Sequence, residues 1–434
     1  MRIVYLNPCG QMGGAETSLV ELLASVRKAA PEWELYLVLG QAGVLGDRAR
    51  QLGATVMVVP FPAALAELGD SGRRPFAAVW SLCTSLWPAA QYARRLAAAI
   101  RTIQPAVIHS NGFKMHVLGS WIRPSKTKLI WHIHDYLSGR PLMSRLLRLC
   151  WRRCAAAIAN SSSVAQDLRS VLPGLRVVPI YNAIDLERFA PQGTTLDLDA
   201  ASGLAPAAEG TIRIGLPATF ARWKGHEVFL RALSLLPRDL PVRGYVIGGP
   251  IYQTTNSQYS KVELQQKANG LGLTDRVGFT GFLDDPAEAM RSLDIIVHAS
   301  TQAEPFGMVI IEGMACGKAM IVSQAGGASE LFINGVDALG HHPGDAARLA
   351  EQMERLARDG ALRRRLGEAA RVATEQRFRG ERLANQLLSL YQQVAGDNNH
   401  VTHGTSSELG LEAPTRAVNL PAAVRTDQTD AMLR

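Results

Sequence analysis

Short apolar runs alternate along the chain with longer segments whose apolar residues recur at helical spacing. In the first half of the sequence the short runs have the length and composition of buried strands. They are Arg2–Asn7, Glu34–Gly40, Ala54–Pro60, Ala106–Ser110, Lys128–His134, Ala156–Asn160 and Arg176–Tyr181. Helical patterns lie between them, among others at Ala15–Leu23, Ala89–Ile103 and Val164–Val171. Strands that alternate with helices in this way predict a parallel, doubly wound sheet.

A second set of alternating elements begins near residue 211. Its expected strands are Ile212–Leu216, Val242–Ile247, Arg276–Thr280, Asp294–His298, Lys318–Ser323 and Ala338–Leu339. Its expected helices are Glu227–Leu236, Lys261–Asn269, Ala287–Arg291, Ala346–Arg358 and Ala361–Arg377. A chain of 434 residues is too long for one ordinary core. We therefore predict an α/β protein with two Rossmann-like, doubly wound parallel-sheet domains that face each other across a cleft.

Changes in composition suggest where these domains begin and end. Residues 1–185 form the N-terminal domain, and 186–210, which are rich in Pro, Gly and small residues without periodicity, form a linker. Residues 211–380 form the C-terminal domain, and 381–395 have the pattern of one more amphipathic helix. Residues 396–434 are polar with little to bury, and we expect them to be disordered.

The charge of the chain favours anionic partners. A formal net charge of +8 and a pI near 9.4 suit phosphorylated substrates, nucleic acid or an acidic membrane surface. Nucleic acid is the weakest of these, because the basic residues do not interleave with aromatic residues that could stack on bases. The five cysteines lack a C-x-x-C pair and fit neither a disulfide framework nor a zinc site. With no signal peptide or membrane-spanning segment evident, we expect a cytoplasmic protein.

The strongest chemical pattern is the stretch Thr301–Gly317, which joins two expected strands. Pro305 and Gly307 have the positions that open a helix, and Gly317 has the position that closes it. Such a corner lies at the carboxyl end of a parallel sheet, where open α/β sheets bind ligands. Glu304 in the loop and Glu312 in the helix would face different parts of one ligand. The alternative is that both acids only favour the helix N-terminus through its dipole.

Two further turns could contribute to a ligand site. Ala218–Gly225 follows a strand and precedes a helix, so Arg222 and Lys224 could pair with a phosphate beside helix amides, or could simply be a solvated basic turn. Gln324–Glu330 is another glycine turn, for which a purely structural role is equally plausible. In the first half, the glycine loop Pro8–Gly14 precedes a helix but is no complete G-x-G-x-x-G, which argues against a nicotinamide cofactor.

Two stretches of the N-terminal half carry other candidate chemistry. In Trp131–Tyr136, His132 and His134 share one face of the strand, where a third metal ligand is not evident. A metal is therefore disfavoured. A hydrogen bond from His134 to a bound polar group is the favoured hypothesis, and a buried structural histidine is its alternative. Residues 142–154 form a basic amphipathic stretch without an acid, suited either to an anionic membrane surface or to an ordinary helix with one solvated face.

Taken together and in this order, these motifs resemble family 4 glycosyltransferases of the two-domain GT-B type over about residues 1–395. The motifs are Gly13–Glu16, His134–Asp135, Asn160–Ser161, Tyr181–Asp185 with Phe189, Trp223–Gly225, Glu304–Glu312 and Gly326–Glu330. The two glutamates of Glu304–Glu312, separated by seven residues, are the most specific of them. The resemblance implies transfer of a sugar from a nucleotide-sugar donor, with a UDP- or GDP-sugar expected, retention at the anomeric carbon, and no metal or other cofactor.

By the same resemblance, the site residues of the second domain have separate roles. Glu304 contacts the transferred sugar at its reacting end, and Glu312 takes the ribose hydroxyls. Backbone amides hold the sugar hydroxyls; they are those of Phe306, Gly307, Met308 and Val309. A retaining glycosidase would instead need two carboxylates about 5–5.5 Å apart, for which a loop glutamate and a helix glutamate are poorly placed.

The resemblance also assigns the groups around the diphosphate. Lys224 binds it from the second domain, Gly14 approaches it from the first, and His134 contacts the sugar, which makes His134 and Glu304 the catalytic candidates. In much of the family an Arg lies five residues before this Lys, where this chain has Thr219. Arg222 could take its place from a different angle, or Lys224 could act with helix amides alone.

Three functions stay open at this point. The first is a retaining glycosyltransferase that acts on a glycan or lipid-linked acceptor, at the inner membrane face if residues 142–154 bind it. The second is a nucleotide-sugar epimerase or hydrolase of the same fold. The third is a non-catalytic protein that binds a sugar nucleotide or a membrane surface, against which the presence of both Glu304 and Glu312 argues.

Overall fold

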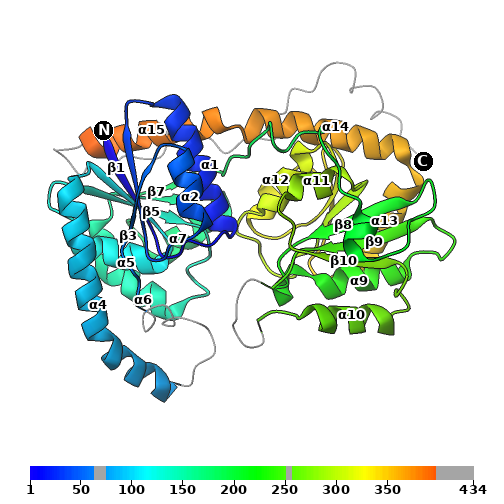
Figure 1. Ribbon diagram of the computed structural model, residues 1–434, viewed down its shortest axis with the longest axis horizontal. Coiled ribbons are helices and arrows are strands. Elements are labelled where there is room, and N and C mark those ends of the chain that lie inside the picture. Colours follow the sequence, from blue (N-terminus) through cyan, green and yellow to red (C-terminus); the bar gives the residue numbers. More distant parts are fainter. Residues whose placement is uncertain (63–74, 251–256, 397–434) are drawn as a thin grey trace. The chain divides into compact units, whose positions relative to one another are not determined.

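A computed structural model describes residues 1–62, 75–250 and 257–396, without the side chains of 75–86 (Figure 1). The polar tail expected at 396–434 lies outside the described residues from residue 397 on. Within the described part the chain forms two parallel sheets, each covered by helices on both faces. The predicted fold class is confirmed.

The first sheet has seven parallel strands in the order β3-β2-β1-β4-β5-β6-β7. Their bounds are β1 Arg2–Asn7, β2 Glu34–Leu39, β3 Thr55–Val58, β4 Val107–Asn111, β5 Lys128–Ile133, β6 Ala156–Ala159 and β7 Val177–Pro179. The chain runs from β1 outward to β3 and then returns to β4 on the other side of β1. This reversal creates a switch point between β1 and β4, where the carboxyl ends of the strands are open to a ligand.

The helices of this first lobe are divided between the two faces of the sheet. Right-handed crossovers place the helices before and after the reversal on opposite faces. One face carries α1 Gly14–Ala29 and α2 Val44–Gln51, and the other carries α4 Pro75–Ile103, α5 Phe113–Ile122, α6 Pro141–Cys150 with η1 Trp151–Arg153, and α7 Ser162–Val171. Helix α4 is longer than the predicted Ala89–Ile103, since Pro88 lies inside the helix instead of preceding it.

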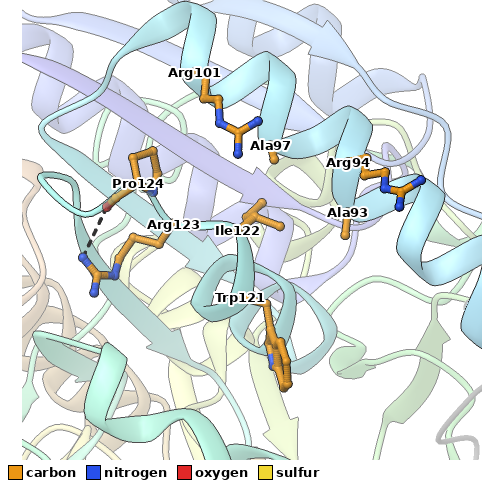
Figure 2. A pocket seen from close by; sticks show the side chains of 8 residues that line it. All are labelled: Ala93, Arg94, Ala97, Arg101, Trp121, Ile122, Arg123 and Pro124. Atoms are coloured by element: carbon orange, nitrogen blue, oxygen red, sulfur yellow. Dashed lines mark hydrogen bonds between the residues drawn. The ribbon is translucent and has the colours of Figure 1, made fainter.

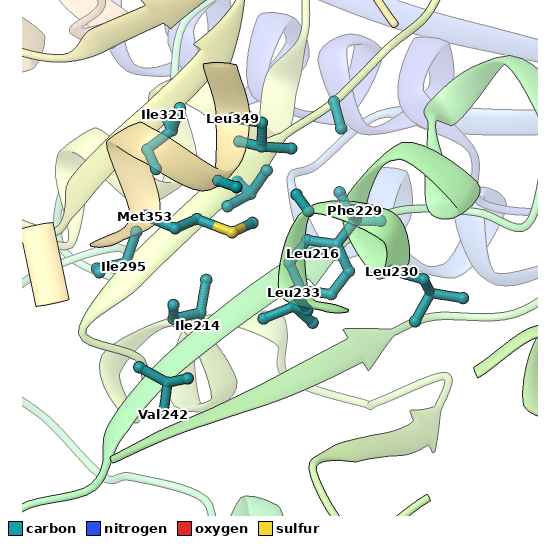
Figure 3. Close-up of a cluster of buried hydrophobic side chains, with 14 of the residues drawn as sticks. Ile214, Leu216, Phe229, Leu230, Leu233, Val242, Ile295, Ile321, Leu349 and Met353 are labelled. Atoms are coloured by element: carbon teal, nitrogen blue, oxygen red, sulfur yellow. The ribbon is translucent and has the colours of Figure 1, made fainter. Parts of the chain in front are cut away.

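The second sheet has six parallel strands in the order β10-β9-β8-β11-β12-β13. Their bounds are β8 Ile212–Pro217, β9 Val242–Ile247, β10 Val277–Gly281, β11 Ile295–His298, β12 Ala319–Ser323 and β13 Leu339–His341. Its helices are η2 Arg222–Lys224, α9 His226–Leu235, α10 Lys261–Gly270, α11 Pro286–Arg291, α12 Met308–Ala315, η3 Gly327–Glu330, α13 Ala346–Arg358 and α14 Gly360–Arg377. Figure 3 shows Ile214 and Ile295 of the sheet packed beside Leu349 and Met353 of α13, in a fully buried core.

The segment between the two sheets packs on the second lobe. It contains the short helix α8 Leu198–Ser202, whose Asp199 is buried. The Asp199 carboxylate accepts hydrogen bonds of 2.6 Å from the Tyr245 hydroxyl and from the Arg243 guanidinium. Burial opposes ionisation of Asp199, but Tyr245 and Arg243 outweigh it and lower its pKa to about 2. This anchor holds part of the expected linker against β9.

The last described helix, α15 Gly380–Gly396, lies against α1 of the first lobe. Leu383, Leu387 and Tyr391 are buried on its apolar side. The Tyr391 hydroxyl is 2.7 Å from His109 Nδ1 on β4. The first lobe is therefore built from two parts of the chain that are far apart in the sequence.

Candidate active site

The stretch predicted to carry the chemistry forms the corner between β11 and β12. Helix α12 begins at Met308, directly after Gly307, which is its N-cap with φ +99°. Gly317, with φ +68°, follows the C-cap Cys316 and ends the helix. Both left-handed conformations favour glycine. Glu312 is thus the fifth helical residue and lies little more than one turn inside α12.

Glu304, in the loop before α12, is a buried carboxylate surrounded by donors. Its oxygens accept hydrogen bonds from Lys224 Nζ at 2.7 and 3.0 Å and from Ser300 Oγ at 2.8 Å. His298 Nε2 is 3.2 Å from the same carboxylate. Burial disfavours the charged form, but Lys224 and His298 outweigh burial and hold the pKa of Glu304 well below its usual range. The carboxylate is therefore ionised and fixed in place.

Lys224 reaches Glu304 because its turn lies directly on the second sheet. Gly225 has φ +80°, and a Cβ added there would lie 1.8 Å from the carbonyl oxygen of Ala299. Only glycine allows this close approach. The backbone N–H of Thr301 donates to the Trp223 carbonyl at 2.7 Å, which ties the turn to the chain leading to Glu304. The structure thus brings together two residues that the sequence placed at separate loops.

Arg222 does not join this ion pair. Its guanidinium pairs with Glu263 of α10 at 2.9 Å and lies over the Tyr259 ring, 4.3 Å from the centroid. Thr219, at the family's Arg position, is half-buried. The sequence suggested that Arg222 and Lys224 could both pair with a phosphate. In the structure Lys224 pairs with Glu304, and Arg222 pairs with Glu263 of α10.

The first lobe meets this corner through Tyr136, three residues after β5. Its hydroxyl donates to the backbone carbonyl of Glu304 at 3.4 Å and is 2.9 Å from Ser163 Oγ. Room for the ring comes from Gly326, where an added Cβ would lie 2.3 Å from the Tyr136 hydroxyl oxygen. The glycine turn before η3 therefore admits Tyr136. His134, two residues before Tyr136, belongs to the same segment of the first lobe.

The glycine loop before α1 has its own distinctive geometry. Gly14 is the first residue of α1, and a Cβ added to it would meet nothing within 4 Å. Packing does not explain a glycine there, whereas the approach of a ligand to the helix N-terminus would. Ser18 of α1 donates to Met308 Sδ at 3.6 Å, so the first turns of α1 and α12 are neighbours.

The predicted amide donors lie at the start of α12. The N–H groups of the first turn of a helix have no intrahelical partner, and those of Met308 and Val309 belong to this turn. Phe306 is buried, with its ring 6.2 Å from that of Tyr181 and 6.3 Å from that of Phe378. This aromatic anchor fixes the loop between Glu304 and Gly307.

Glu312 lies in surroundings that disfavour its negative charge, and Arg188 only partly offsets this effect. Burial raises the pKa of Glu312 to about 7, against the opposing effect of Arg188. On α1, burial together with the charges of Asp185 and Glu312 raises the pKa of Glu21 to about 7 as well. Glu312 of α12 and Glu21 of α1 are therefore close enough to influence each other. The sequence singled out Glu312 but gave no indication of Glu21.

Glu330 has a partner that the sequence did not predict. Its carboxylate accepts from the backbone N–H groups of Ser162 and Ser163, at 2.8 and 2.7 Å, and from the Tyr181 hydroxyl at 2.7 Å. A residue of the second lobe thus caps the N-terminus of α7 in the first lobe. The sequence contained one indication of this contact. Asn160–Ser161, Tyr181 and Glu330 all belong to the motifs that resemble those of family 4 glycosyltransferases.

Two other features bear on the sequence predictions. The rings of His132 and His134 are tilted by 37° relative to each other, with their centroids 4.0 Å apart. In the part of the chain that the structure describes, no three His, Cys, Asp or Glu side chains are grouped as metal ligands. Among the same residues, no helix has the length and apolar character needed to cross a bilayer.

Comparison with known proteins identifies the family. Residues 12–188 match the family described as Glycosyltransferase Family 4, and residues 206–373 match the family described as Glycosyl transferases group 1. The two matches follow each other along the chain and correspond to the two lobes.

Individual proteins agree with these matches. N-acetyl-alpha-D-glucosaminyl L-malate synthase of Bacillus anthracis is 26% identical over 264 residues, covering 60% of this chain and 66% of that protein. D-inositol 3-phosphate glycosyltransferase of Streptomyces bingchenggensis is 30% identical over 251 residues, covering 55% of this chain and 52% of that protein. The chain thus spans from about half to two thirds of the length of these relatives.

Among solved structures, HepE of Anabaena in complex with UDP-glucose has a TM-score of 0.73 at 25% identity, covering 91% of this chain and 100% of that one. With two consecutive family matches, two parallel sheets and a shared architecture, the chain belongs to the group 1 glycosyltransferases of family 4 and has the GT-B fold.

Proposed function

We propose that the chain is a retaining glycosyltransferase that moves a sugar from a nucleotide-sugar donor to a glycan or lipid-linked acceptor, without a metal ion or other cofactor. The observation that carries this proposal is the buried ion pair of Lys224 and Glu304 at the carboxyl edge of the second sheet. In this proposal the Lys224 cation would stabilise the negative charge of the leaving diphosphate, and the Glu304 carboxylate would contact the sugar.

The residues of this corner suggest how the reaction would proceed. A donor diphosphate would take Lys224 as its partner and leave Glu304 to accept hydrogen bonds from the sugar hydroxyls. The N–H groups of Met308 and Val309 would add the positive end of the α12 dipole. As the bond from the anomeric carbon to the phosphate oxygen breaks, negative charge grows on the diphosphate, and these fixed groups stabilise it without Mg²⁺.

The acceptor is proposed to enter on the face from which the diphosphate leaves. Its hydroxyl oxygen forms the new bond to the anomeric carbon, and its proton passes to an oxygen of the leaving diphosphate. This course retains the anomeric configuration and needs no enzyme carboxylate as a nucleophile. It agrees with the separate surroundings of Glu304, which is paired with Lys224, and Glu312, which lies beside Arg188.

The donor is proposed to be a UDP- or GDP-sugar. HepE, at 25% identity, was crystallised with UDP and with UDP-glucose, which supports UDP. Glu312 would bind the ribose, which both nucleotides share, and so favours neither. A thermal-shift screen with UDP-, GDP- and ADP-sugars tests this point, because a ligand that binds only the folded state raises the melting temperature.

The loops of the first lobe are the proposed acceptor side, since loops at the carboxyl ends of strands vary with the ligand. They include residues 10–14, residues 111–116, which continue into α5, and residues 136–149, which continue into α6. Residues 73–87 belong to the same proposed set, but 75–87 are helical in α4, and the side chains up to residue 86 lie outside the described residues.

The outer surface of α4, α5 and α6 supports a membrane-bound acceptor. Residues 71–166 carry fourteen of the 46 Lys and Arg residues of the chain but one of its 38 acids, Asp135, which pairs with Arg140. This segment therefore contributes more than the whole net charge of the protein. Trp121 and Leu149 are 65% and 79% exposed on the same surface. We propose that this basic face, which includes 142–154, binds the anionic inner face of the membrane from the cytoplasm.

A hollow of about 340 Å³ lies on this basic face between α4 and α5. Figure 2 shows Arg94 and Arg101 projecting from α4, with Trp121 and Arg123 at the end of α5. Guanidinium groups around an open hollow suit the phosphate of a lipid headgroup, and an indole beside them suits the headgroup level of a bilayer.

Turnover assays distinguish the proposed reaction from its alternatives. Purified protein is incubated in EDTA with UDP-glucose or GDP-mannose, with and without a bacterial lipid extract as acceptor. We expect nucleoside diphosphate to be released when the extract is present, with sugar appearing in the lipid fraction. Rapid conversion of the donor to an epimer or to free sugar without the extract would instead indicate an epimerase or hydrolase. Donor binding without any turnover would indicate a binding protein.

A further inference from the structure

A buried pair of asparagines connects the glycine loop of the first lobe to His134. Asn7 is the last residue of β1 and Asn111 the last of β4, on the two sides of the switch point. Each side chain is 1% exposed. Buried amides of this kind must satisfy both their N–H groups and their carbonyl oxygen. This requirement fixes which group donates in each hydrogen bond of the series that runs from the Cys9 carbonyl to His134.

The direction of the first bond follows from the chemistry of its acceptors. Asn7 Nδ2 is 2.7 Å from the backbone carbonyl of Cys9 and 3.2 Å from Glu16 Oε1. A carbonyl and an ionised carboxylate only accept hydrogen bonds, so the Asn7 atom that faces them must be the NH₂ group. The Asn7 carbonyl oxygen then faces Asn111, and it accepts from Asn111 Nδ2 at 2.7 Å.

The orientation of the Asn111 amide also determines which group donates in the hydrogen bond between Asn111 and His134. Because the Asn111 NH₂ group is used towards Asn7, its Oδ1 faces His134 Nε2, with which it forms a short hydrogen bond. An amide oxygen only accepts, so His134 Nε2 must carry a hydrogen. Burial lowers the pKa of His134 to about 4, and the ring is therefore neutral near pH 7. A neutral ring with its proton on Nε2 has an unprotonated Nδ1.

The Nδ1 atom of His134 is free to meet a ligand. It forms no hydrogen bond with any residue that the structure describes, and His134 is only half-buried. The titratable side chains that face His134 are His132 on the same strand, His109 on β4 and His116 on α5, and burial lowers the pKa of each. Among the described residues, none of these three histidines forms a hydrogen bond with Nδ1 of His134.

We propose that Asn7 and Asn111 are positioning residues that hold His134 as the Nε2–H tautomer, so that its Nδ1 accepts a hydrogen bond from a hydroxyl of the bound sugar. That the ligand is a sugar rests on the proposed function. The same amide pair holds the Cys9 carbonyl of the glycine loop, so one buried link sets both the loop that approaches the diphosphate and the tautomer of the histidine.

The test measures the tautomer directly. Protein labelled with ¹⁵N in histidine is titrated by NMR, and the His134 signals are assigned from their loss in His134→Gln. We expect the ¹⁵N shifts of a neutral ring with the proton on Nε2 between pH 6 and 8. A proton on Nδ1, or an imidazolium at pH 7, would overturn the proposal. The measurement needs no turnover, so its outcome is independent of the proposed function.

Asn111→Asp supplies the second readout. The new carboxylate keeps the acceptor for Nε2–H but adds a negative charge beside the ring, which favours the imidazolium. We expect the pKa of His134 to rise by about one to three units, with the acid limb of the kcat/KM profile moving to higher pH by the same amount. Asn334→Asp adds the same charge at an exposed site of the second lobe. It should change neither the pKa of His134 nor the acid limb of the kcat/KM profile. An unchanged His134 titration in Asn111→Asp would refute the link.

Discussion

At the scale of single residues, the site depends on carboxylates whose surroundings push their pKa values in opposite directions. Glu304 is held ionised by Lys224, whereas burial raises the pKa of Glu312 to about 7, so that this carboxyl is only partly ionised at pH 7. Two glutamates from one short motif therefore have different chemistry. Their roles can be separated by substitutions that keep the shape of the side chain and remove its charge.

Glu304→Gln should abolish most turnover while donor binding stays measurable. It removes the carboxylate proposed to contact the reacting sugar, and we expect kcat to fall by about 10²-fold or more. It also leaves Lys224 without its buried partner, which should lower the free energy of unfolding by about 3 kcal/mol. Denaturant melts and single-turnover kinetics measure the two effects.

The matched control is Glu263→Gln. Glu263 of α10 is the ion-pair partner of Arg222, which lies in the same turn as Lys224. That pair is exposed to solvent, so its loss should change the stability little and leave kcat unchanged. Equal kcat values in Glu304→Gln and the unmodified protein would exclude Glu304 from the reaction.

Glu312→Gln should stabilise the ligand-free protein at alkaline pH. The folded-state pKa of Glu312, about 7, lies above its usual value of 4.5. Below pH 4.5 the Glu312 carboxyl is protonated in both the folded and the unfolded state, so it does not lower the free energy of unfolding. As pH rises from 4.5 through 7, the unfolded chain ionises first, and the free energy of unfolding falls. A glutamine at this position does not ionise, so it does not lower the free energy of unfolding as pH rises.

Denaturant melts at pH 5 and pH 8 test this difference. The variant should gain stability over the unmodified protein at pH 8 and little at pH 5, while its affinity for the donor drops because the ribose contact is lost. A gain of the same size at both pH values would show that ionisation is not its origin.

At the scale of elements, the sequence predicted the order of strands and helices well, because most strands are short and mainly apolar, with polar residues on either side. It also placed Glu304 and Lys224 at the carboxyl ends of strands. It could not predict that they pair, since the pairing depends on how closely Gly225 approaches Ala299 across the sheet. The cap of α7 by Glu330 depends likewise on contacts between lobes that no local pattern records.

Gly225→Ala should disrupt the site through the backbone. An added Cβ would meet the Ala299 carbonyl oxygen at 1.8 Å, so the Lys224 turn must move away from Glu304. We expect both turnover and stability to fall. Gly203→Ala is the matched control, because Gly203 has a similar φ of +72° with nothing within 4 Å of the added Cβ. It should show only the left-handed strain of about 1–2 kcal/mol. Equal losses in both variants would mean that the close contact has no role.

At the scale of the whole molecule, residues 71–166, which include α4, α5 and α6 of the first lobe, carry fourteen Lys and Arg residues but one acid. The protein should therefore bind vesicles that contain phosphatidylglycerol and not vesicles of phosphatidylcholine alone, and binding should weaken as salt rises. Co-sedimentation measures this. Changing both Arg145 and Arg152 to Gln should reduce binding several-fold.

The control for this experiment changes Arg355 and Arg364 of the second lobe to Gln, which removes the same net charge from exposed positions elsewhere. If it reduces vesicle binding as much as the first pair does, the attraction is a general effect of net charge. In that case the basic face would have no special role.

The packing of α15 against α1 has a consequence for how the protein is made. Leu383, Leu387 and Tyr391 complete the apolar face that covers β1 and β4, yet they leave the ribosome about 200 residues after the last strand of the first sheet. During that interval the nascent first lobe exposes a surface that its own chain has not yet supplied. Its folding can therefore finish only after α15 has been synthesised, and chaperones that shield apolar surface would be needed most in that interval.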